Sequence, residues 1–261
     1  MVLAFENFSV RYQKSLLAVN DVSLCATRGS ILAVVGESGS GKSTLIRSVI
    51  GLLPPDGEIV SGRMLFCDEN ITHPTPSRLH TLRGKEIAMV FQDARASLNP
   101  RRKIGSQFIE SLRCQERYSV KEATRIALEV LADVRMTDPK RVMDSYSFEL
   151  SGGMCQRVAL AMSISKYVQP KLLLADEPTS SLDVTMQAQM IRRLLEYRDR
   201  FGTSIVIVTH NFGVAAYMAD YIAVMKGGSL VEWGERDRII LSPHEPYTRR
   251  LLDAVPQMEV G

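Results

Sequence analysis

The chain has 261 residues, of which 45% are hydrophobic and 23% are charged, and its net charge is +3 at pH 7. This is the composition of an ordinary globular protein, and it excludes a disordered chain, a collagen-like repeat and a disulfide scaffold. The length suits one large α/β domain or two small ones. A charge so close to balance gives no argument for nucleic acid as a partner.

No uninterrupted apolar stretch approaches the roughly 18 residues that a membrane-spanning helix needs. The first residues lack a basic leader followed by an apolar segment, so we expect no signal peptide and a cytosolic chain. The cysteines form no CxxC pair that could chelate a metal or act in redox chemistry, and we expect buried, inert thiols. They are Cys25, Cys67, Cys114 and Cys155.

Hydropathy patterns predict the elements in chain order. Residues 1–30 alternate apolar and polar side chains, which is typical of short antiparallel strands. Residues 31–35 form a continuous apolar run, followed by a Gly- and Ser-rich loop and by helical spacing over residues 43–53. Further buried strands are predicted at residues 172–175 and 204–208. Short apolar strands separated by helices predict a mostly parallel sheet that binds ligands at the carboxyl ends of its strands.

Helical patterns dominate the middle of the chain, and we interpret this region as an inserted helical subdomain. Its helices are predicted at residues 104–112, 120–131 and 154–166. Residues 221–231 predict a final hairpin that turns at Gly227 and Gly228.

Residues 36–44 read Gly-Glu-Ser-Gly-Ser-Gly-Lys-Ser-Thr, the phosphate-binding pattern G-x-x-x-x-G-K-[ST] between a predicted strand and a predicted helix. Glycines let backbone N–H groups turn inward around phosphate oxygens, and the helix N-terminus adds positive potential. Lys42 is predicted to reach the terminal phosphates, and the Ser43 hydroxyl to ligate Mg²⁺. The segment predicts a nucleoside triphosphate site built from Gly36, Ser38, Gly39, Ser40, Gly41, Lys42, Ser43 and Thr44.

Two adjacent carboxylates follow the strand predicted at residues 172–175. Successive strand residues diverge, so Asp176 and Glu177 are expected to have different roles. Asp176 is placed to hold Mg²⁺, directly or through water, while Glu177 can polarise the attacking water.

A second candidate anion site lies at residues 150–157, which read Leu-Ser-Gly-Gly-Met-Cys-Gln-Arg. Ser151, Gly152 and Gly153 open a predicted helix, and a helix N-terminus of this kind binds phosphate. The alternative interpretation is a plain N-cap turn. Two anion sites on one chain need an explanation that the first loop alone does not supply.

With these motifs in this order, the chain resembles the ATP-binding subunits of ABC transporters over nearly its whole length. Residues 36–44 resemble the Walker A loop, residues 150–156 the LSGGQ signature and residues 172–177 the Walker B strand. The family arrangement explains the second anion site, because each ATP lies between Walker A of one chain and the signature of another in a head-to-tail dimer.

Four single residues match further features of that family. Gln92 resembles the Q-loop, Asp183 the D-loop and His210 the switch histidine. Tyr12, 24 residues before the Walker A loop, matches the aromatic residue that stacks on adenine. The resemblance implies that Gln92 and His210 sense the γ-phosphate, with Gln92 also placed at Mg²⁺. It makes Glu177 the catalytic base and places Asp183 across the dimer interface.

The resemblance implies an α/β fold, a RecA-like P-loop NTPase core with an antiparallel β subdomain and an inserted helical subdomain. The whole chain would be one nucleotide-binding domain that binds ATP and Mg²⁺. Its parts are expected at residues 1–92 with 167–230 for the core and β subdomain, 93–166 for the helical subdomain and 231–261 for the C-terminal tail.

Two segments resemble the importer ATPases for oligopeptides, dipeptides and nickel. They are residues 97–105 and the tail at 242–256, which reads Ser-Pro-His-Glu-Pro-Tyr-Thr-Arg-Arg-Leu-Leu-Asp-Ala-Val-Pro. This branch implies uptake of nickel, of another transition metal or metal–chelator complex, or of peptides. Longer members carry a cysteine-rich C-terminal extension, and the chain has no Cys after Cys155, which favours a metal cargo.

The same resemblance implies the partners and the place of action. The partners are two integral membrane permease subunits, a second ABC ATPase that is non-identical or another copy, and an extracytoplasmic solute-binding protein, with no nucleic acid. The chain would act at the cytoplasmic face of the inner membrane and pass its motion to the permeases through a groove beside Gln92 and residues 98–105. The alternatives are a soluble ABC ATPase acting on nucleic acid or the ribosome, and the ATPase of a separate-chain exporter.

Cys155 departs from the family pattern, in which Arg or Gln is frequent around this position. Hydrolysis is expected to survive the departure, because Ser151, Gly152 and Gly153 supply the phosphate contacts. Our hypothesis is that Cys155 lies near the composite site and that thiol reagents slow ATP hydrolysis through it.

Overall fold

The structure is a computed structural model that describes residues 1–13, 16–180 and 182–254. Ser181 of the D-loop segment and residues 255–261 of the tail lie outside the described residues. By its internal contacts the chain divides into two compact units, Met1–His80 with Ser204–Gly261 and Thr81–Thr203. The boundaries expected at residues 92/93, 166/167 and 230/231 remain a prediction.

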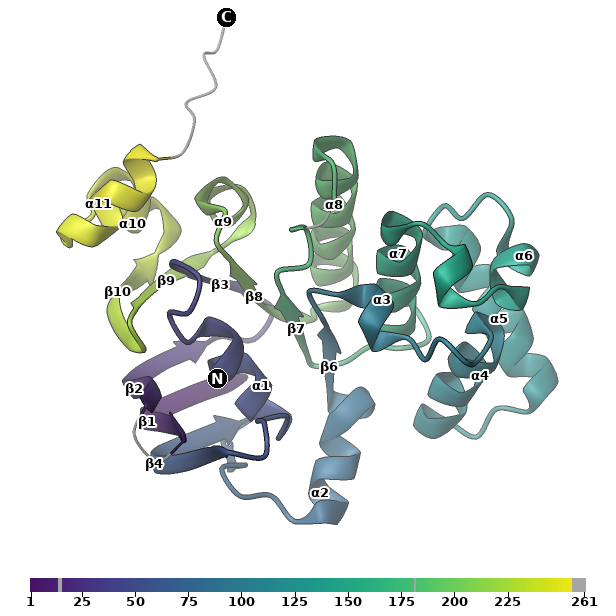
Figure 1. Cartoon of the computed structure of the whole chain (residues 1–261), viewed down its shortest axis with the longest axis horizontal. Helices are drawn as coiled ribbons and strands as arrows, with labels where there is room; N and C mark the ends of the chain where they lie inside the picture. The colour runs from purple at the N-terminus through teal and green to yellow at the C-terminus, as the bar shows by residue number, and fades with distance from the viewer. Residues whose placement is uncertain (14–15, 181, 255–261) are drawn as a thin grey trace, which may run out of the picture. The chain divides into compact units, whose positions relative to one another are not determined.

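An antiparallel sheet forms the first part of the first unit. Its strands lie in the order β2-β1-β4-β5, with bounds Leu3–Tyr12 for β1, Leu16–Ala26 for β2, Gly57–Phe66 for β4 and Glu69–Asn70 for β5. Apolar side chains such as Phe8 and Val22, which face each other across β1 and β2, are fully buried. The antiparallel strands expected over residues 1–30 are confirmed (Figure 1).

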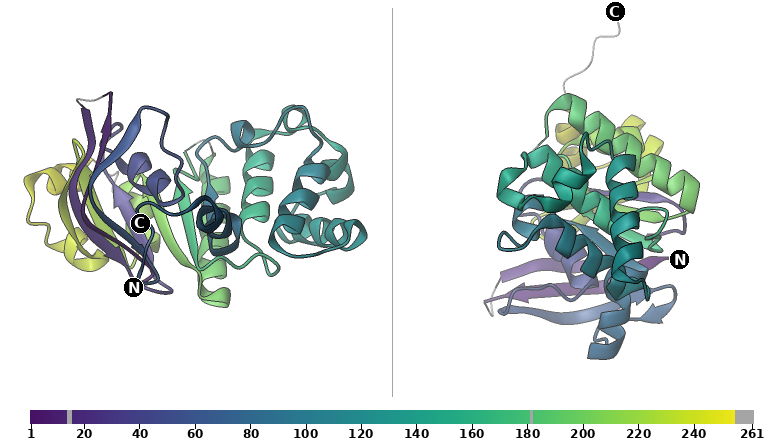
Figure 2. Two further views of the ribbon diagram at one scale, coloured as in Figure 1. Left: turned by 90° about the horizontal axis from the view of Figure 1, so that it is seen from below. Right: turned by 90° about the vertical axis from the view of Figure 1, so that its right-hand side faces the viewer.

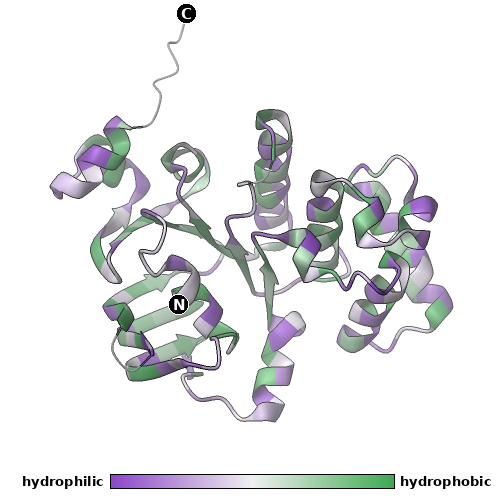
Figure 3. Cartoon of the chain, viewed as in Figure 1, coloured by the Kyte–Doolittle hydropathy of each residue, from purple (hydrophilic) through white to green (hydrophobic). Residues whose placement is uncertain are grey.

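The first unit also contains a group of strands that pair mostly in parallel. β3 pairs in parallel with β8 and with β9, and β10 pairs antiparallel to β9. The bounds are Ile31–Val35 for β3, Ser204–Thr209 for β8, Tyr221–Lys226 for β9 and Ser229–Glu235 for β10. Every residue of β3 and β8 is buried, which agrees with their apolar sequences (Figure 3). The β9–β10 turn at Gly227 and Gly228 confirms the predicted hairpin.

Among the described residues of this unit, five helices accompany these strands. They are α1 at Lys42–Val49, α2 at Pro76–Thr81, α9 at Phe212–Met218, α10 at Arg236–Leu241 and α11 at Pro246–Asp253. α1 ends four residues before the predicted end at residue 53, because the chain turns at Gly51, where φ is +60°. None of the helices in the described part of the chain combines the length and apolar character needed to span a bilayer.

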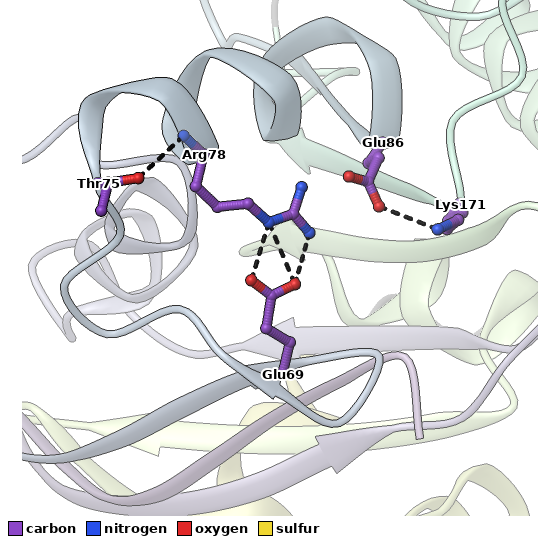
Figure 4. A network of polar contacts seen from close by, with 5 residues as sticks. All are labelled: Glu69, Thr75, Arg78, Glu86 and Lys171. Carbon is purple, nitrogen blue, oxygen red and sulfur yellow. Dashed lines mark hydrogen bonds and ion pairs between the residues drawn. The ribbon is translucent and has the colours of Figure 1, made fainter.

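Local polar contacts fix short elements in each unit (Figure 4). In the first unit the Arg78 guanidinium of α2 makes a bidentate pair with Glu69 of β5, and Thr75 accepts a hydrogen bond from the Arg78 backbone N–H. In the second unit Lys171 pairs with Glu86 at 2.9 Å, just before β7 and β6 begin. These pairs are partly exposed, so each is worth at most about 1 kcal/mol and acts mainly by positioning.

The second unit combines two parallel strands with a helical group. β6 at Ile87–Val90 pairs in parallel with β7 at Leu172–Asp176. The helices are α3 at Ala94–Ser97, α4 at Ile104–Gln115, α5 at Val120–Asp133, α6 at Pro139–Asp144, α7 at Gly152–Ser163 and α8 at Val184–Phe201. Short turns of helix lie at Leu82–Glu86 and Ser147–Glu149.

The helical part of this unit has a hydrophobic core of its own, drawn from residues 94–168. Phe108 of α4, Ile126 of α5 and Val158 of α7 are each at most 1% exposed within it. The helices start where the sequence offers caps: Ser119 forms a capping box with Glu122 at the start of α5. Figure 2 shows α4 to α7 gathered into one group, which supports the expected helical subdomain.

Candidate nucleotide site

The loop between β3 and α1 has a backbone conformation that favours glycine. Gly41, the N-cap of α1, has φ of +94°, and Gly39 has φ of +79°. A Cβ atom on Gly41 would lie 2.1 Å from the Ala18 carbonyl oxygen, and one on Gly36 would lie 2.1 Å from that of Met225. The backbone of the neighbouring strands thus packs directly against the loop, and this close packing fixes the loop conformation at the start of α1.

Lys42 fills the centre of this loop. Its Nζ donates to the carbonyl oxygens of Gly36 at 2.8 Å and Glu37 at 2.6 Å, and to Ser40 Oγ at 3.3 Å. Lys42 is only 4% exposed, so the loop holds a nearly buried cation. A positive charge beside the N-terminus of α1 is the electrostatic environment that phosphate groups require.

We predict that Gly41→Ala destabilises the fold and abolishes nucleotide binding, whereas Gly39→Ala is much milder. The new methyl group at position 41 meets backbone at 2.1 Å, and a Cβ at position 39 meets nothing within 4 Å. Overpacking costs about 1–3 kcal/mol and a left-handed alanine about 1–2 kcal/mol, so Gly41→Ala should cost roughly 3 kcal/mol and Gly39→Ala about 1–2. Urea unfolding checks this, and equal losses in both variants would contradict it.

Tyr12 and His210 lie near this loop within the first unit. The Tyr12 hydroxyl donates to Thr44 Oγ1 at 3.0 Å, which joins the end of β1 to the first turn of α1. His210 is exposed and follows Thr209, the last residue of β8, which pairs with Val35 at the end of β3. The parallel register therefore brings His210 to the same sheet edge as the loop. Stacking of Tyr12 on adenine remains a prediction.

The carboxylates lie in the second unit, where β7 ends. Asp176 is the last residue of β7 and is 0% exposed. Glu177 has φ of +45°, a left-handed conformation that is uncommon for a residue other than glycine. Gln92, just beyond β6, donates from Nε2 to Glu177 Oε2 at 3.4 Å. Backbone strain of this kind persists where the surrounding structure imposes it, and it gathers at functional sites.

The signature segment begins α7. Ser151 and Gly152 are exposed, and Ser151 Oγ accepts a hydrogen bond from the Met154 N–H at 3.3 Å, so the residue caps the helix. Gln156, to which the motifs assign no role, donates from Nε2 to the Pro178 carbonyl at 2.9 Å. Gln156 is 1% exposed, so this buried bond ties α7 to the segment that follows β7. Its polarity on the apolar side of α7 is the signal that could have revealed it.

Asp183 lies at the start of α8. Its carboxylate accepts a hydrogen bond from the Met186 N–H at 2.9 Å and so caps the helix. The side chain is exposed. An exposed cap is compatible with the predicted contact across a dimer interface.

The predicted Mg²⁺ ligands have the right chemistry for that ion. Ser43 offers a hydroxyl, Gln92 an amide and Asp176 a buried carboxylate. Mg²⁺ prefers hard oxygen ligands and is commonly bound by one or two such groups together with substrate phosphates. Gln92 turns its amide nitrogen to Glu177, so its oxygen is the atom that would ligate the ion. Each of these side chains, taken by itself, therefore has donor chemistry that suits Mg²⁺.

The burial of Cys155 contradicts the hypothesis that thiol reagents act through it. The residue is 0% exposed in the helical core, and its Sγ donates to the Ser147 carbonyl at 3.4 Å. Burial raises the pKa of the Cys155 thiol, so the protein keeps it in the unreactive protonated form. Hydrophobic packing of the second unit explains the choice of a small apolar residue here.

Of the four thiols expected to be buried, only Cys155 is; Cys25 and Cys67 are partly exposed and Cys114 is exposed. We therefore predict that a thiol reagent modifies Cys114 in the native chain and leaves Cys155 unmodified until the chain unfolds. Peptide mass spectrometry after a short exposure checks this. Cys114→Ser serves as the control, and modification of Cys155 at the rate of Cys114 would be inconsistent with the structure.

Comparison with known proteins identifies the family of this chain. The model of the ABC transporter family matches residues 19–180. An oligopeptide transport ATP-binding protein, OppD of Haemophilus influenzae, is 40% identical over 99% of this chain and 80% of its own length. A dipeptide transport ATP-binding protein, DppD of Bacillus subtilis, is 38% identical over 100% of this chain and 78% of its own length.

The fold has close solved counterparts. A dimeric structure of the ATP-binding cassette MJ0796, bound to ADP and Pi after hydrolysis, superposes with a TM-score of 0.79 and 25% identity. The match covers 90% of this chain and 99% of that chain. The predicted α/β P-loop NTPase fold is thereby confirmed. The chain belongs to the ABC transporter family and is one of its ATP-binding subunits.

Proposed function

We propose that the chain hydrolyses ATP to drive the uptake of peptides through a membrane importer. This proposal rests on the names of the similar proteins. Proteins named for oligopeptide and dipeptide transport are 38–41% identical to this chain over at least 95% of its length. The transition-metal cargo that the sequence analysis favoured gains no support from these names. Peptides are therefore the cargo we propose.

Each predicted site residue takes a role in this proposal. The loop at residues 36–44 and Lys42 hold the phosphates, and Tyr12 stacks on the adenine ring. Glu177 accepts the proton of the attacking water, and Gln92 orients that carboxylate through its amide. His210 hydrogen-bonds the γ-phosphate.

Ser43, Gln92 and Asp176 would hold Mg²⁺, which supplies charge neutralisation on the β- and γ-phosphates when it is bound. The oxygen donors of these three side chains support this assignment.

A second ATPase copy completes the site in this proposal. Ser151, Gly152 and Gly153 would contact the ATP held by the partner, and Asp183 would cross the interface. The exposed N-terminus of α7 and the dimeric solved structure of the MJ0796 cassette support this arrangement. The partner is a second, non-identical ATPase or another copy of this chain.

The remaining partners would be two permease subunits and an extracytoplasmic solute-binding protein. The chain would bind the permeases at the cytoplasmic face of the inner membrane. The relatives' names as ATP-binding proteins of transport systems support a peripheral subunit of this kind.

An uptake assay tests the proposed cargo. The source cell, with its other peptide importers deleted, would carry either the parent chain or Glu177→Gln, and the uptake of a labelled dipeptide, a labelled pentapeptide and ⁶³Ni would be measured. The proposal predicts that the variant loses peptide uptake and keeps nickel uptake. Loss of nickel uptake with unchanged peptide uptake would refute the proposed cargo.

A further inference from the structure

The C-terminal helix α11 contacts the phosphate-binding loop through one tyrosine. The backbone N–H of Glu37, the second residue of that loop, donates to the Tyr247 hydroxyl at 3.3 Å. Tyr247 is only 6% exposed, and 210 residues of sequence separate it from Glu37. It belongs to the Pro-Tyr-Thr segment of the tail, to which neither the sequence analysis nor the proposed function gives a role.

The Tyr247 ring is held by cations from two elements. Lys226, at the end of β9, places its Nζ 5.0 Å from the ring centroid, and the Arg250 guanidinium of α11 lies at 6.0 Å. The residue before Lys226 is Met225, whose carbonyl oxygen lies so close to Gly36 that it leaves no room for a Cβ atom there. The end of β9 therefore contacts both the loop and the tyrosine that binds the loop.

A buried carboxylate fixes the turn that precedes α11. Glu232 of β10 is 7% exposed, and it accepts hydrogen bonds from the backbone N–H groups of His244 at 2.9 Å and Glu245 at 3.2 Å. Burial alone would raise the pKa of Glu232, but these hydrogen bonds and Arg238 together lower it, so the carboxylate stays ionised at neutral pH. Charge-assisted bonds of this kind are stronger than neutral ones and hold the start of α11 against β10.

We infer that Tyr247 is a positioning residue for nucleotide binding, which fixes the first turn of the phosphate-binding loop from the C-terminal helix. The chain of contacts runs from Glu232 to the turn at His244 and Glu245, then to Tyr247 and the Glu37 N–H. Movement of α11 would therefore change the shape of the loop. The inference rests on the proposed role of residues 36–44 in binding ATP.

The bond acts through preorganisation rather than through contact with the nucleotide. A loop that must be ordered on binding loses affinity by the cost of that ordering. One hydrogen bond of this kind is worth a factor of about 2 to 10 in an equilibrium constant. Tyr247→Phe removes only the hydroxyl and keeps the ring against Lys226, so it should weaken binding of a non-hydrolysable ATP analogue about 2- to 10-fold.

The experiment combines two measurements on the full chain. Amide hydrogen exchange, measured by NMR without nucleotide, should be faster at Glu37 in Tyr247→Phe than in the parent. Calorimetric titration with the ATP analogue gives the affinity, and Tyr217→Phe, which removes a hydroxyl from a residue that is 64% exposed in the same unit, should change neither quantity. Glu232→Gln should also speed amide exchange at Glu37 and weaken binding of the ATP analogue.

The double variant Glu232→Gln/Tyr247→Phe tests whether both residues act through one chain of contacts. Its loss of affinity should be smaller than the product of the two separate losses.

The outcomes separate this inference from the proposed function. Unchanged exchange at Glu37 would overturn the contact itself. Faster exchange with unchanged affinity, or a lower melting temperature with unchanged affinity, would overturn the positioning role, since a purely structural residue behaves in that way. A parent chain that binds no nucleotide would overturn the proposed function as well, while the exchange measurement would still report on the contact.

Discussion

Glu177→Gln is expected to bind ATP with nearly parental affinity and to lower the rate of ATP hydrolysis about 10²- to 10⁴-fold. The amide is close to the carboxylate in size and keeps an oxygen that can accept the Gln92 hydrogen bond, which spans 3.4 Å in the parent. It cannot accept the proton of the attacking water. The single change therefore removes the base and leaves the binding surface in place.

Two measurements on the assembled transporter check this result. ATP turnover gives the rate, and the amount of ATP retained after gel filtration gives binding, which should persist in the variant. Glu116→Gln is the matched control, because Glu116 is an exposed carboxylate in the same unit, at the C-cap of α4. Full turnover in Glu177→Gln would remove Glu177 as the base.

Lys42→Ala is expected to weaken ATP binding about 100-fold or more. Hydrogen bonds to charged groups contribute about 1.5–3 kcal/mol each, so two such bonds to phosphate account for at least that factor. The ammonium already occupies the loop, held by the Gly36 and Glu37 carbonyls, and only small adjustments bring it to bound phosphate oxygens. Turnover should fall with affinity, because the variant holds too little ATP to hydrolyse.

Titration with a non-hydrolysable analogue measures this effect on the purified chain. Lys140→Ala is the control, since Lys140 is an exposed lysine of α6 in the second unit. The melting temperature should be recorded for each variant, because removing Lys42 also leaves buried carbonyl groups without their partner. An affinity within a factor of about 3 of the parent would be incompatible with the assigned role of Lys42.

The loop at residues 36–44 and the buried strands around it are the parts of the fold that the sequence predicts best. The glycines of residues 36–44 reveal the conformation of the loop, since left-handed turns such as that at Gly41 favour glycine. The apolar run before the loop and the helical pattern after it show where it lies in the fold. The strands predicted at residues 31–35, 172–175 and 204–208 were also correct to within one residue, because fully buried strands are uniformly apolar.

Features that depend on distant contacts could not be predicted. Hydropathy patterns predict neither β6, which is only four residues long, nor α8, whose surface is mostly polar apart from buried residues such as Leu194. The hypothesis of a reactive Cys155 is wrong, because its burial within the helical core depends on helices far away along the chain. Neighbouring residues in the sequence predict neither the left-handed backbone of Glu177 nor the contact between Tyr247 and Glu37.

An ATPase that energises a peptide importer works in a complex with membrane proteins, so the proteins that bind this chain in its own cell reveal its function. The chain would be tagged in its own cell, the membranes solubilised gently, and the co-purifying proteins identified by mass spectrometry. We predict two multispanning permeases, a second ATPase and a solute-binding protein that binds peptides. Recovery of ribosomal or DNA-bound proteins with no membrane protein would contradict a role in transport, even if the chain hydrolyses ATP.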